Sequence, residues 1–186
     1  MEFVASALDR IRKIKLVIFD VDGVLTDGGL YVGAQGESMK RFYVKDGLAI
    51  TLARQAGLKT AIITGRYSAM VEQRAKELSI DAVWQGCGDK CKAYRELKKK
   101  FNFGDEEIAY IGDDLLDLPI MLQVGFAAAV GDAAAEVKHS AHLIAAEDGG
   151  HGAVREILEF VLKTQNKWEN VIAGFRNTSI TETPAH

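Results

Sequence analysis

Apolar residues along the chain recur in two alternating patterns. Short unbroken apolar runs are typical of strands buried on both faces of a sheet, whereas apolar residues at every third or fourth position are typical of helices. This alternation predicts an α/β fold, in which a mostly parallel sheet is covered by helices on both faces. The predicted strands are 16–19, 60–63, 82–84, 109–111, 126–129 and 142–144. The predicted helices are 47–55, 68–78, 91–101, 115–122, 133–138 and 153–162.

One segment, residues 26–45, interrupts the alternation. Two strand-like pieces, LYV and MKRFYV, flank the glycine-rich sequence VGAQGES. This pattern predicts a β-hairpin that is inserted after the first strand and stands above the edge of the sheet. The gaps between the other predicted elements are short, so the chain has no room for a separate cap domain.

The two ends of the chain carry different patterns. Residues 1–14, MEFVASALDRIRKI, predict an amphipathic helix, because charges occur throughout instead of flanking an apolar run as in a secretion signal. After about residue 163 the sequence becomes polar and loses its periodicity. We therefore expect one domain over residues 1–163, followed by a flexible C-terminal tail over residues 164–186.

Composition narrows the range of partners. The formal net charge is −3, and no apolar run approaches the length of a transmembrane helix, so neither nucleic acid nor a membrane is an expected partner. The two cysteines, Cys87 and Cys91, have no further Cys or His ligands close by in the sequence and are interpreted as unpaired thiols. We expect a cytoplasmic protein.

The first candidate site follows the first predicted strand. Asp20 and Asp22 lie two positions apart, so both carboxylates point the same way at the strand's carboxyl end. They would repel each other unless a cation such as Mg²⁺ compensated them. One carboxylate can attack phosphorus, while the other protonates the leaving oxygen and then activates water. Two turn-forming aspartates before Gly23 would give the same pattern without any chemistry.

The next two predicted strands end in residues that suit a phosphate group. Thr64 offers a hydroxyl and a backbone amide, Gly65 permits close approach, and Arg66 follows. Thr64 is equally suited to cap a helix. Lys90 would offset the negative charge of phosphate and carboxylates, although most lysines are solvated surface groups.

A second acidic cluster follows the strand 109–111. Asp113 and Asp114 would complete the oxygen ligands of Mg²⁺, directly or through water. Asp117 lies in the first turn of the following helix, where an interaction with the helix dipole also explains it. Because the carboxyl ends of parallel strands meet at one edge, the motifs together predict a phosphoryl-transfer site.

Over residues of about 14–163, the chain resembles the haloacid dehalogenase superfamily in these motifs. The resemblance implies a Rossmann-like fold, Mg²⁺ dependence and an aspartyl-phosphate intermediate. It implies that Asp20 is the nucleophile and Asp22 the general acid and base, while Thr64 and Lys90 hold the phosphoryl group. Mg²⁺ would be bound by Asp20, the backbone carbonyl of Asp22, and Asp113.

A closer resemblance is to the family of 3-deoxy-D-manno-octulosonate 8-phosphate phosphatases. It is carried by DVDGVLTDG, FYVKDG, ITGR, QGxxxK, GDDLxD and GGxGAVRE. It implies a capless homotetramer that acts in lipopolysaccharide precursor synthesis, in which the hairpins and a neighbour's C-terminal segment close the site. The substrate-binding residues that it implies are Asp22, Tyr43, Val44, Lys45, Asp46, Gly47, Gly65, Arg66, Arg74 and Lys90.

Two positions depart from the family pattern. Thr51 stands where the family often has arginine, and its GGRG appears as GGHG with His151. The substrate could therefore be a related nine-carbon sugar-acid phosphate of the sialic-acid type. A non-catalytic regulatory module with the same fold is a further alternative. Arg66 and Arg74 are also explained as the solvated face of a helix.

Overall fold

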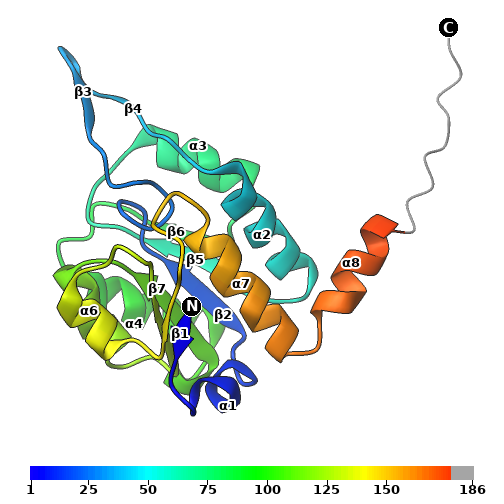
Figure 1. The fold of residues 1–186 in the computed structure, drawn as a ribbon. Helices are drawn as coiled ribbons and strands as arrows, with labels where there is room; N and C mark the ends of the chain where they lie inside the picture. Colours follow the sequence, from blue (N-terminus) through cyan, green and yellow to red (C-terminus); the bar gives the residue numbers. More distant parts are fainter. Residues whose placement is uncertain (177–186) are drawn as a thin grey trace, which may run out of the picture.

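A seven-stranded sheet lies at the centre of the computed structural model, which describes residues 1–176 (Figure 1). The strand order is β1-β9-β8-β7-β2-β5-β6, and every neighbouring pair is parallel except β1 with β9. The strands are β1 (Glu2–Phe3), β2 (Leu16–Phe19), β5 (Lys59–Ile63), β6 (Ala82–Trp84), β7 (Ile108–Gly112), β8 (Phe126–Ala129) and β9 (Leu143–Ile144).

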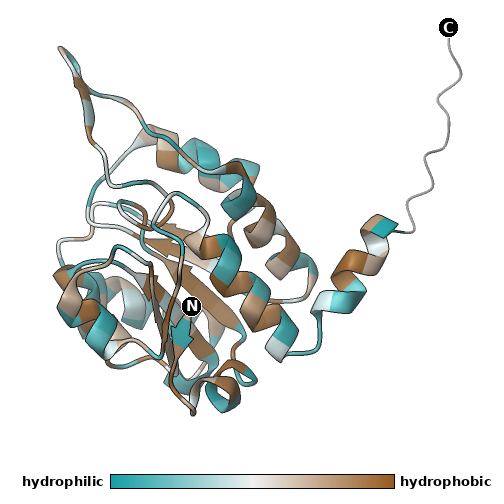
Figure 2. Cartoon of the chain, viewed as in Figure 1, coloured by the Kyte–Doolittle hydropathy of each residue, from teal (hydrophilic) through white to brown (hydrophobic). Residues whose placement is uncertain are grey.

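Helices cover both faces of this sheet, which confirms the predicted α/β fold. Figure 2 shows why the layers hold together: the central strands, such as β2, are apolar, while the helices carry both apolar and polar residues. One face carries α1 (Ala7–Ile11), α2 (Val44–Gln55), α3 (Ala69–Glu77) and α7 (Ala153–Thr164). The other carries α4 (Lys90–Phe101), α5 (Leu118–Met121) and α6 (Ala135–Ser140), with the 3₁₀ turns η1 (Asp105–Glu107) and η2 (Leu115–Asp117) nearby.

The central strand β2 sets the position of the site. All of its residues are buried, and it pairs with β5 on one side and β7 on the other. The chain continues outward from β2 in both directions, which is the topological switch point where open α/β sheets bind ligands. Phe19 is in register with Ile62 of β5 and with Ile111 of β7. The segments just beyond these residues, which carry the candidate chemistry, therefore lie side by side.

The predicted hairpin is present, and it projects beyond the edge of the sheet (Figure 1). Its strands are β3 (Tyr31–Gly33) and β4 (Gly36–Met39), joined by a tight turn in which Gly36 has φ +104°. The predicted second strand over 39–44 was wrong, because the turn is shorter than expected and α2 already begins at Val44. In the described part of the chain, this hairpin is the only insertion over the site, and no cap domain is present.

Both ends of the chain differ from the prediction. Residues 1–14 hold only a short helix, because Glu2–Phe3 instead pair with β9 and Phe3 packs on Phe160 with ring centroids 5.1 Å apart. The predicted flexible tail over 164–186 contains a further helix, α8 (Trp168–Arg176). Its apolar residues recur at helical spacing from Trp168 to Phe175, a periodicity that the sequence interpretation missed. The rest of that tail, 177–186, lies outside the described residues.

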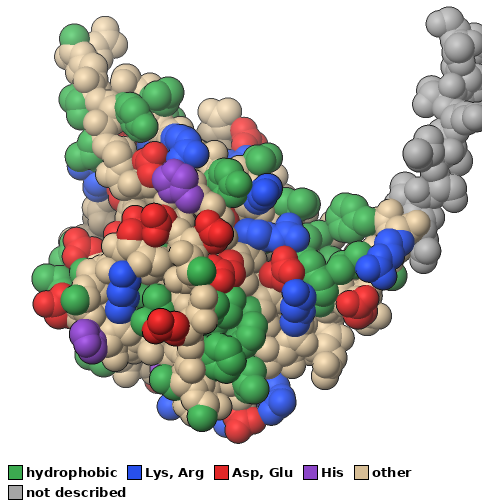
Figure 3. Space-filling model, in the orientation of Figure 1, with side chains coloured by type: hydrophobic (Ala, Val, Ile, Leu, Met, Phe, Trp, Pro, Cys, Tyr) green, Lys and Arg blue, Asp and Glu red, His purple; other side chains and the backbone are tan. Residues whose placement is uncertain are grey.

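Charged side chains are mixed on the face shown in Figure 3, where acidic and basic groups alternate around α7. That face therefore has no large field of a single sign. Within residues 1–176, no helix combines the length and apolar character that crossing a membrane requires.

Candidate active site

A buried lysine joins two carboxylates beneath the sheet edge. Lys90 begins α4, and its Nζ lies 2.8 Å from Oδ2 of Asp20 and 2.7 Å from Oδ1 of Asp117. All three residues are buried. Asp20 immediately follows β2, and its Oδ1 accepts a hydrogen bond from the amide of Val21 at 2.7 Å. The carboxylate of Asp20 is therefore fixed in direction, as a nucleophile must be.

Asp117, which the sequence pattern explained as a helix-dipole group, belongs to this buried cluster. Its Oδ1 also accepts from the hydroxyl of Tyr110 at 2.7 Å, and its Oδ2 accepts from the backbone amides of Asp113 and Asp114 at 3.0 and 3.3 Å. Asp117 thus holds the loop after β7 in place while it orients Lys90. The signal available in the sequence was the final aspartate of GDDLLD, which the 3₁₀ turn η2 returns beneath the loop.

Three carboxylates face one ammonium group in this cluster. Ligand oxygens of Asp20, Asp113 and Asp117 lie within 4.8 Å of one another. Burial and the nearby Asp117 raise the pKa of Asp20 to about 6, although Lys90 opposes this shift. Burial, Asp117 and Asp20 raise the pKa of Asp113 to about 8. The cluster therefore carries more negative charge than Lys90 compensates.

The donor atoms in this cluster fit a hard divalent cation. Within residues 1–176, the buried Oδ1 of Asp113 has no hydrogen-bond partner, whereas both oxygens of Asp117 already accept hydrogen bonds. Oxygen ligands and excess negative charge are what Mg²⁺ requires. Among the side chains, Asp20 and Asp113 are the ligands that this geometry favours.

Asp22 lies apart from the buried lysine and belongs to a second charged network. Its Oδ1 pairs with Nζ of Lys40, and its Oδ2 lies 3.8 Å from Nε of Arg66. Lys40 also contacts Glu37 of the hairpin at 2.9 Å. Asp22 and Arg66, both predicted to contact substrate, thus lie near each other, whereas Lys40 and Glu37 were not expected in this region.

Thr64 lies at the end of β5, directly beside β2. It is buried, its amide donates to the carbonyl of Trp84 at 2.9 Å, and its carbonyl accepts from the amide of Cys87 at 3.1 Å. These bonds join the loop after β5 to the loop that leads to Lys90. A side chain added at Gly65 would meet no protein atom closer than the carbonyl of Cys87 at 3.9 Å. The backbone at Gly65 is therefore open to close approach.

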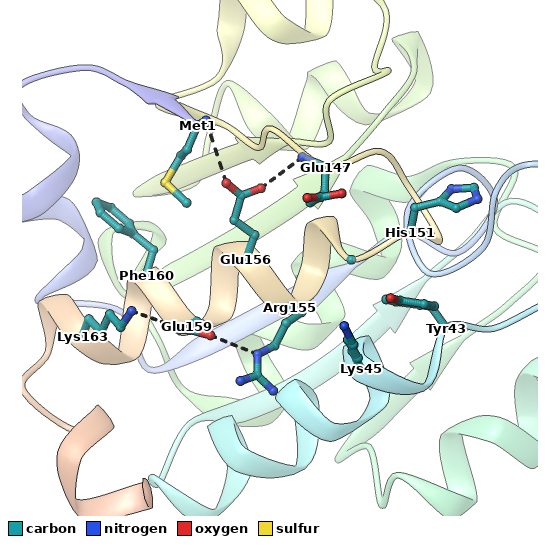
Figure 4. A pocket seen from close by; sticks show the side chains of 11 residues that line it. Met1, Tyr43, Lys45, Glu147, His151, Arg155, Glu156, Glu159, Phe160 and Lys163 are labelled. Atoms are coloured by element: carbon teal, nitrogen blue, oxygen red, sulfur yellow. Dashed lines mark hydrogen bonds and ion pairs between the residues drawn. The ribbon is translucent and has the colours of Figure 1, made fainter.

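The block from Tyr43 to Gly47 does not line the carboxylate cluster in the described chain. Tyr43 and Lys45, with His151 and Arg155, line one part of a cavity of about 440 Å³ that extends along α7 as far as Lys163 (Figure 4). Val44 is exposed, whereas Asp46 is buried and accepts a hydrogen bond from the amide of Arg155 at 2.7 Å. Burial raises the pKa of Asp46 to about 6. Substrate contact by this block stays a prediction.

The remaining predicted positions are held by neighbouring groups. Arg74 pairs with Glu77 at 3.2 Å and approaches Gly47 so closely that a side chain there would lie 2.2 Å from Nη2. The hydroxyl of Thr51 donates to the carbonyl of Gly47 at 3.2 Å. The ring of His151 contacts the carbonyl of Gly149 at 2.9 Å and Nη1 of Arg41 at 3.0 Å.

Gly23 is required by its position above Asp113, which leads to a first prediction. Gly23 has φ +87°, and a Cβ added there would lie 2.0 Å from Oδ2 of Asp113. We expect Gly23→Ala to displace Asp113 and to lower kcat by at least about tenfold, because small displacements at a reacting centre have large effects. The matched control is Gly36→Ala, which has φ +104° but no atom within 4 Å. Equal kinetics for the two variants would contradict the role of Asp113.

Comparisons with known proteins agree with this geometry. A family model described as haloacid dehalogenase-like hydrolase matches residues 83–157. The chain is 44% identical over 164 residues to the 3-deoxy-D-manno-octulosonate 8-phosphate phosphatase of Yersinia pestis, and the match covers 88% of each chain. The crystal structure of the phosphatase of that name from Moraxella catarrhalis, in complex with magnesium, phosphate and a KDO molecule, has a TM-score of 0.88 at 42% identity and covers 91% of this chain and 98% of that one.

A third relative extends the agreement to the subfamily. A hydrolase of subfamily III A of the haloacid dehalogenase superfamily from Legionella pneumophila has a TM-score of 0.88 at 43% identity, with 93% of this chain and 95% of that chain covered. Identity at this level over most of both chains establishes common descent as well as a common fold. The chain therefore belongs to the haloacid dehalogenase superfamily and, within it, to the family of the 3-deoxy-D-manno-octulosonate 8-phosphate phosphatases.

Proposed function

We propose that the protein is a Mg²⁺-dependent phosphatase that hydrolyses 3-deoxy-D-manno-octulosonate 8-phosphate to the free sugar acid and phosphate. The observation that carries this proposal is the buried Asp20 carboxylate, which Lys90 holds at the end of the central strand beside the unpartnered oxygen of Asp113. Family membership supports the same reaction class. A module that had lost catalysis would have no need for so costly a cluster of buried charges.

The reaction divides into two transfers at Asp20. In the first, an oxygen of Asp20 attacks phosphorus, the bond from phosphorus to the sugar oxygen breaks, and Asp22 gives its proton to that leaving oxygen. In the second, Asp22 takes a proton from water as the water oxygen attacks the aspartyl phosphate. Phosphate is released and Asp20 is restored as a carboxylate.

The other groups of the site hold charge in place during these transfers. Lys90 offsets charge on Asp20, while Thr64 and the space above Gly65 suit the oxygens of the phosphoryl group. Asp20, Asp113 and the backbone carbonyl of Asp22 would hold Mg²⁺, which neutralises negative charge between the carboxylates and the phosphoryl oxygens when it is bound.

The sugar acid is the part of the proposal that family membership supports most and that site geometry supports least. Arg66 lies beside Asp22 with half its side chain exposed, so it is available to a second anionic group on the substrate. Because Thr51 and His151 depart from the family pattern, a nine-carbon sugar-acid phosphate is a second candidate substrate. The test is kcat/KM on each phosphate. A higher value on the eight-carbon substrate supports the proposal, and a higher value on the nine-carbon substrate replaces it.

Proton release on metal binding gives a second prediction. Without a metal, the raised pKa of Asp113, about 8, means that Mg²⁺ must displace a proton below that pH. We therefore expect Mg²⁺ affinity, measured by calorimetry, to rise up to about tenfold for each pH unit between pH 6 and 7 for one displaced proton. Asp113→Asn should weaken binding and remove this slope. An affinity that is independent of pH would contradict the assignment.

We propose further that four copies assemble, as the family resemblance implies. Apolar side chains of the hairpin are exposed, among them Val32 at 70% and Met39 at 52%. We expect light scattering to give the mass of a tetramer, and Val32→Glu to lower that mass. The matched control is Leu122→Glu, at an equally exposed apolar position on α5's end. A wild-type monomer would overturn the proposal. Closure of the site by a neighbour's C-terminal segment stays a prediction, since 177–186 lie outside the described residues.

A further inference from the structure

A lysine of the hairpin is buried against the proposed general acid. Lys40 directly follows β4, and its side chain is only 2% exposed, although the hairpin strands themselves are largely exposed. Its Nζ contacts Asp22 and lies 2.9 Å from Oε1 of Glu37. A lysine is rarely buried unless its charge is paired. The ammonium group of Lys40 is thus committed to these two carboxylates.

The hairpin presents this lysine from a defined position. Glu37 lies within β4, where Val32 pairs with it across the hairpin, and the hydroxyl of Ser38 donates to the carbonyl of Tyr31 at 2.9 Å. Lys40 comes immediately after this strand, so its direction is set by the paired backbone. The hairpin therefore reaches the loop after β2 through one buried ion pair.

Arg66 is poorly placed to fix the position of the Asp22 side chain. Its Nε lies 3.8 Å from Oδ2 of Asp22, beyond hydrogen-bond distance, and its side chain is 51% exposed. Exposed pairs of this kind contribute little. Among the described residues, Lys40 is the buried cation that contacts Asp22.

We infer that Lys40 is a positioning residue, which holds the Asp22 carboxyl group beside the leaving oxygen and so couples the hairpin to proton transfer. The inference rests on the proposed function, in which Asp22 protonates the leaving sugar oxygen. Lys40 itself touches neither phosphorus nor the leaving group in this account. Replacing Lys40 should therefore slow only those reactions in which Asp22 must protonate the leaving group.

Two substrates separate this role from a general structural one. A sugar alkoxide needs protonation as it leaves, whereas 4-nitrophenolate leaves without it. For Lys40→Met we expect kcat/KM on the sugar-acid phosphate to fall about tenfold or more, and on 4-nitrophenyl phosphate to fall by less than about threefold, since kcat/KM reports steps only through the first transfer. Lys40→Gln keeps a hydrogen-bond donor, so its kcat/KM should also fall more on the sugar-acid phosphate than on 4-nitrophenyl phosphate, but by a smaller factor than in Lys40→Met.

A double mutant tests whether Lys40 acts through Asp22. In an Asp22→Asn background, adding Lys40→Met should change kcat/KM on the sugar-acid phosphate by less than about threefold, because the two residues act as a unit. The matched control is Lys76→Met. Lys76 is an exposed lysine that pairs with Glu72 on α3, so this change should leave kcat/KM on both substrates unaffected.

Each outcome bears on the inference. Equal losses on both substrates in Lys40→Met and Lys40→Gln, no loss on either, or full additivity with Asp22→Asn would overturn it. If Lys40→Met does not fold, the Lys40→Gln ratio decides. A wild-type protein that releases no phosphate from any sugar-acid phosphate but hydrolyses 4-nitrophenyl phosphate would overturn the proposed substrate instead, so the two failures are distinct.

Discussion

Asp20→Asn is expected to lower turnover of a sugar-acid phosphate by at least about 10³-fold, because the amide cannot form the covalent intermediate. The change is nearly isosteric, so the side chain should still fill its place at the end of β2. Burial and Asp117 raise the pKa of the carboxyl to about 6, above its value in the unfolded chain, so at neutral pH the ionised Asp20 lowers the stability of the folded protein. We therefore expect the melting temperature of the metal-free variant to equal or exceed that of the wild type.

The control for this variant is the same substitution at a solvated position. Asp9 has a side chain that is 80% exposed and pairs with Arg12. Asp9→Asn should leave kinetics and stability unchanged. Near-normal turnover by Asp20→Asn would show that another group attacks phosphorus.

Lys90→Met is expected to damage both stability and catalysis. Nζ of Lys90 lies within 2.8 Å of two buried carboxylates, and Met would leave both without a cation. Removing one partner of a buried ion pair costs about 3–5 kcal/mol. Turnover should fall at least about 10²-fold, because Lys90 also offsets charge in the transition state. Denaturant unfolding of the metal-free protein and steady-state kinetics measure the two effects.

The pH dependence of this stability loss follows from its cause. Lys90 lowers the pKa values of Asp20 and Asp113, so without it both rise further above those of the unfolded chain, and the folded state retains protons that the unfolded state releases. Stability is then present at low pH and lost as pH rises, and the deficit should grow from pH 5 to pH 8. Lys98→Met on the same helix is the control, since Lys98 pairs with the more exposed Asp105. If the unfolding free energy of Lys90→Met equals that of the wild type, Lys90 does not stabilise the buried carboxylates.

Pattern and motif were sufficient to predict the edge where chemistry occurs. The buried run 16–19 matches β2, and the strands that precede Thr64, Lys90 and Asp113 were each located within one residue at either end. This success has a physical basis: strands buried on both faces are apolar without interruption, and a parallel sheet brings their carboxyl ends together. Asp20, Lys90 and Asp113 therefore lie close together, as the sequence predicted.

The residues that sequence reasoning missed depend on how turns return the chain. Asp117 reaches beneath Asp113 only because η2 is a tight 3₁₀ turn, and Lys40 reaches Asp22 only because the hairpin is shorter than the glycine-rich sequence suggested. Neither the 3₁₀ turn nor the length of the hairpin can be recognised from the spacing of apolar residues along the sequence. The strand β1 was missed for a similar reason, since two residues are too few to show a pattern.

The placement of the Tyr43–Gly47 block shows where resemblance and geometry differ. Resemblance implied substrate contact, whereas in the described chain Tyr43 and Lys45 face a cavity beside α7, and Asp46 is buried against the start of that helix. The sequence could not indicate this, because the packing of α2 on α7 joins segments more than a hundred residues apart. The assembly experiment and the substrate comparison both bear on this block.

The position of the phosphoryl group during turnover shows whether Asp20 is the nucleophile. Purified protein with Mg²⁺ would be mixed with 3-deoxy-D-manno-octulosonate 8-phosphate, quenched in acid within the first turnover, and digested for mass spectrometry. We expect a phosphoryl group on Asp20, absent without Mg²⁺ and absent in Asp20→Asn. Phosphate release with no adduct on Asp20, or with an adduct on a different residue, would contradict it.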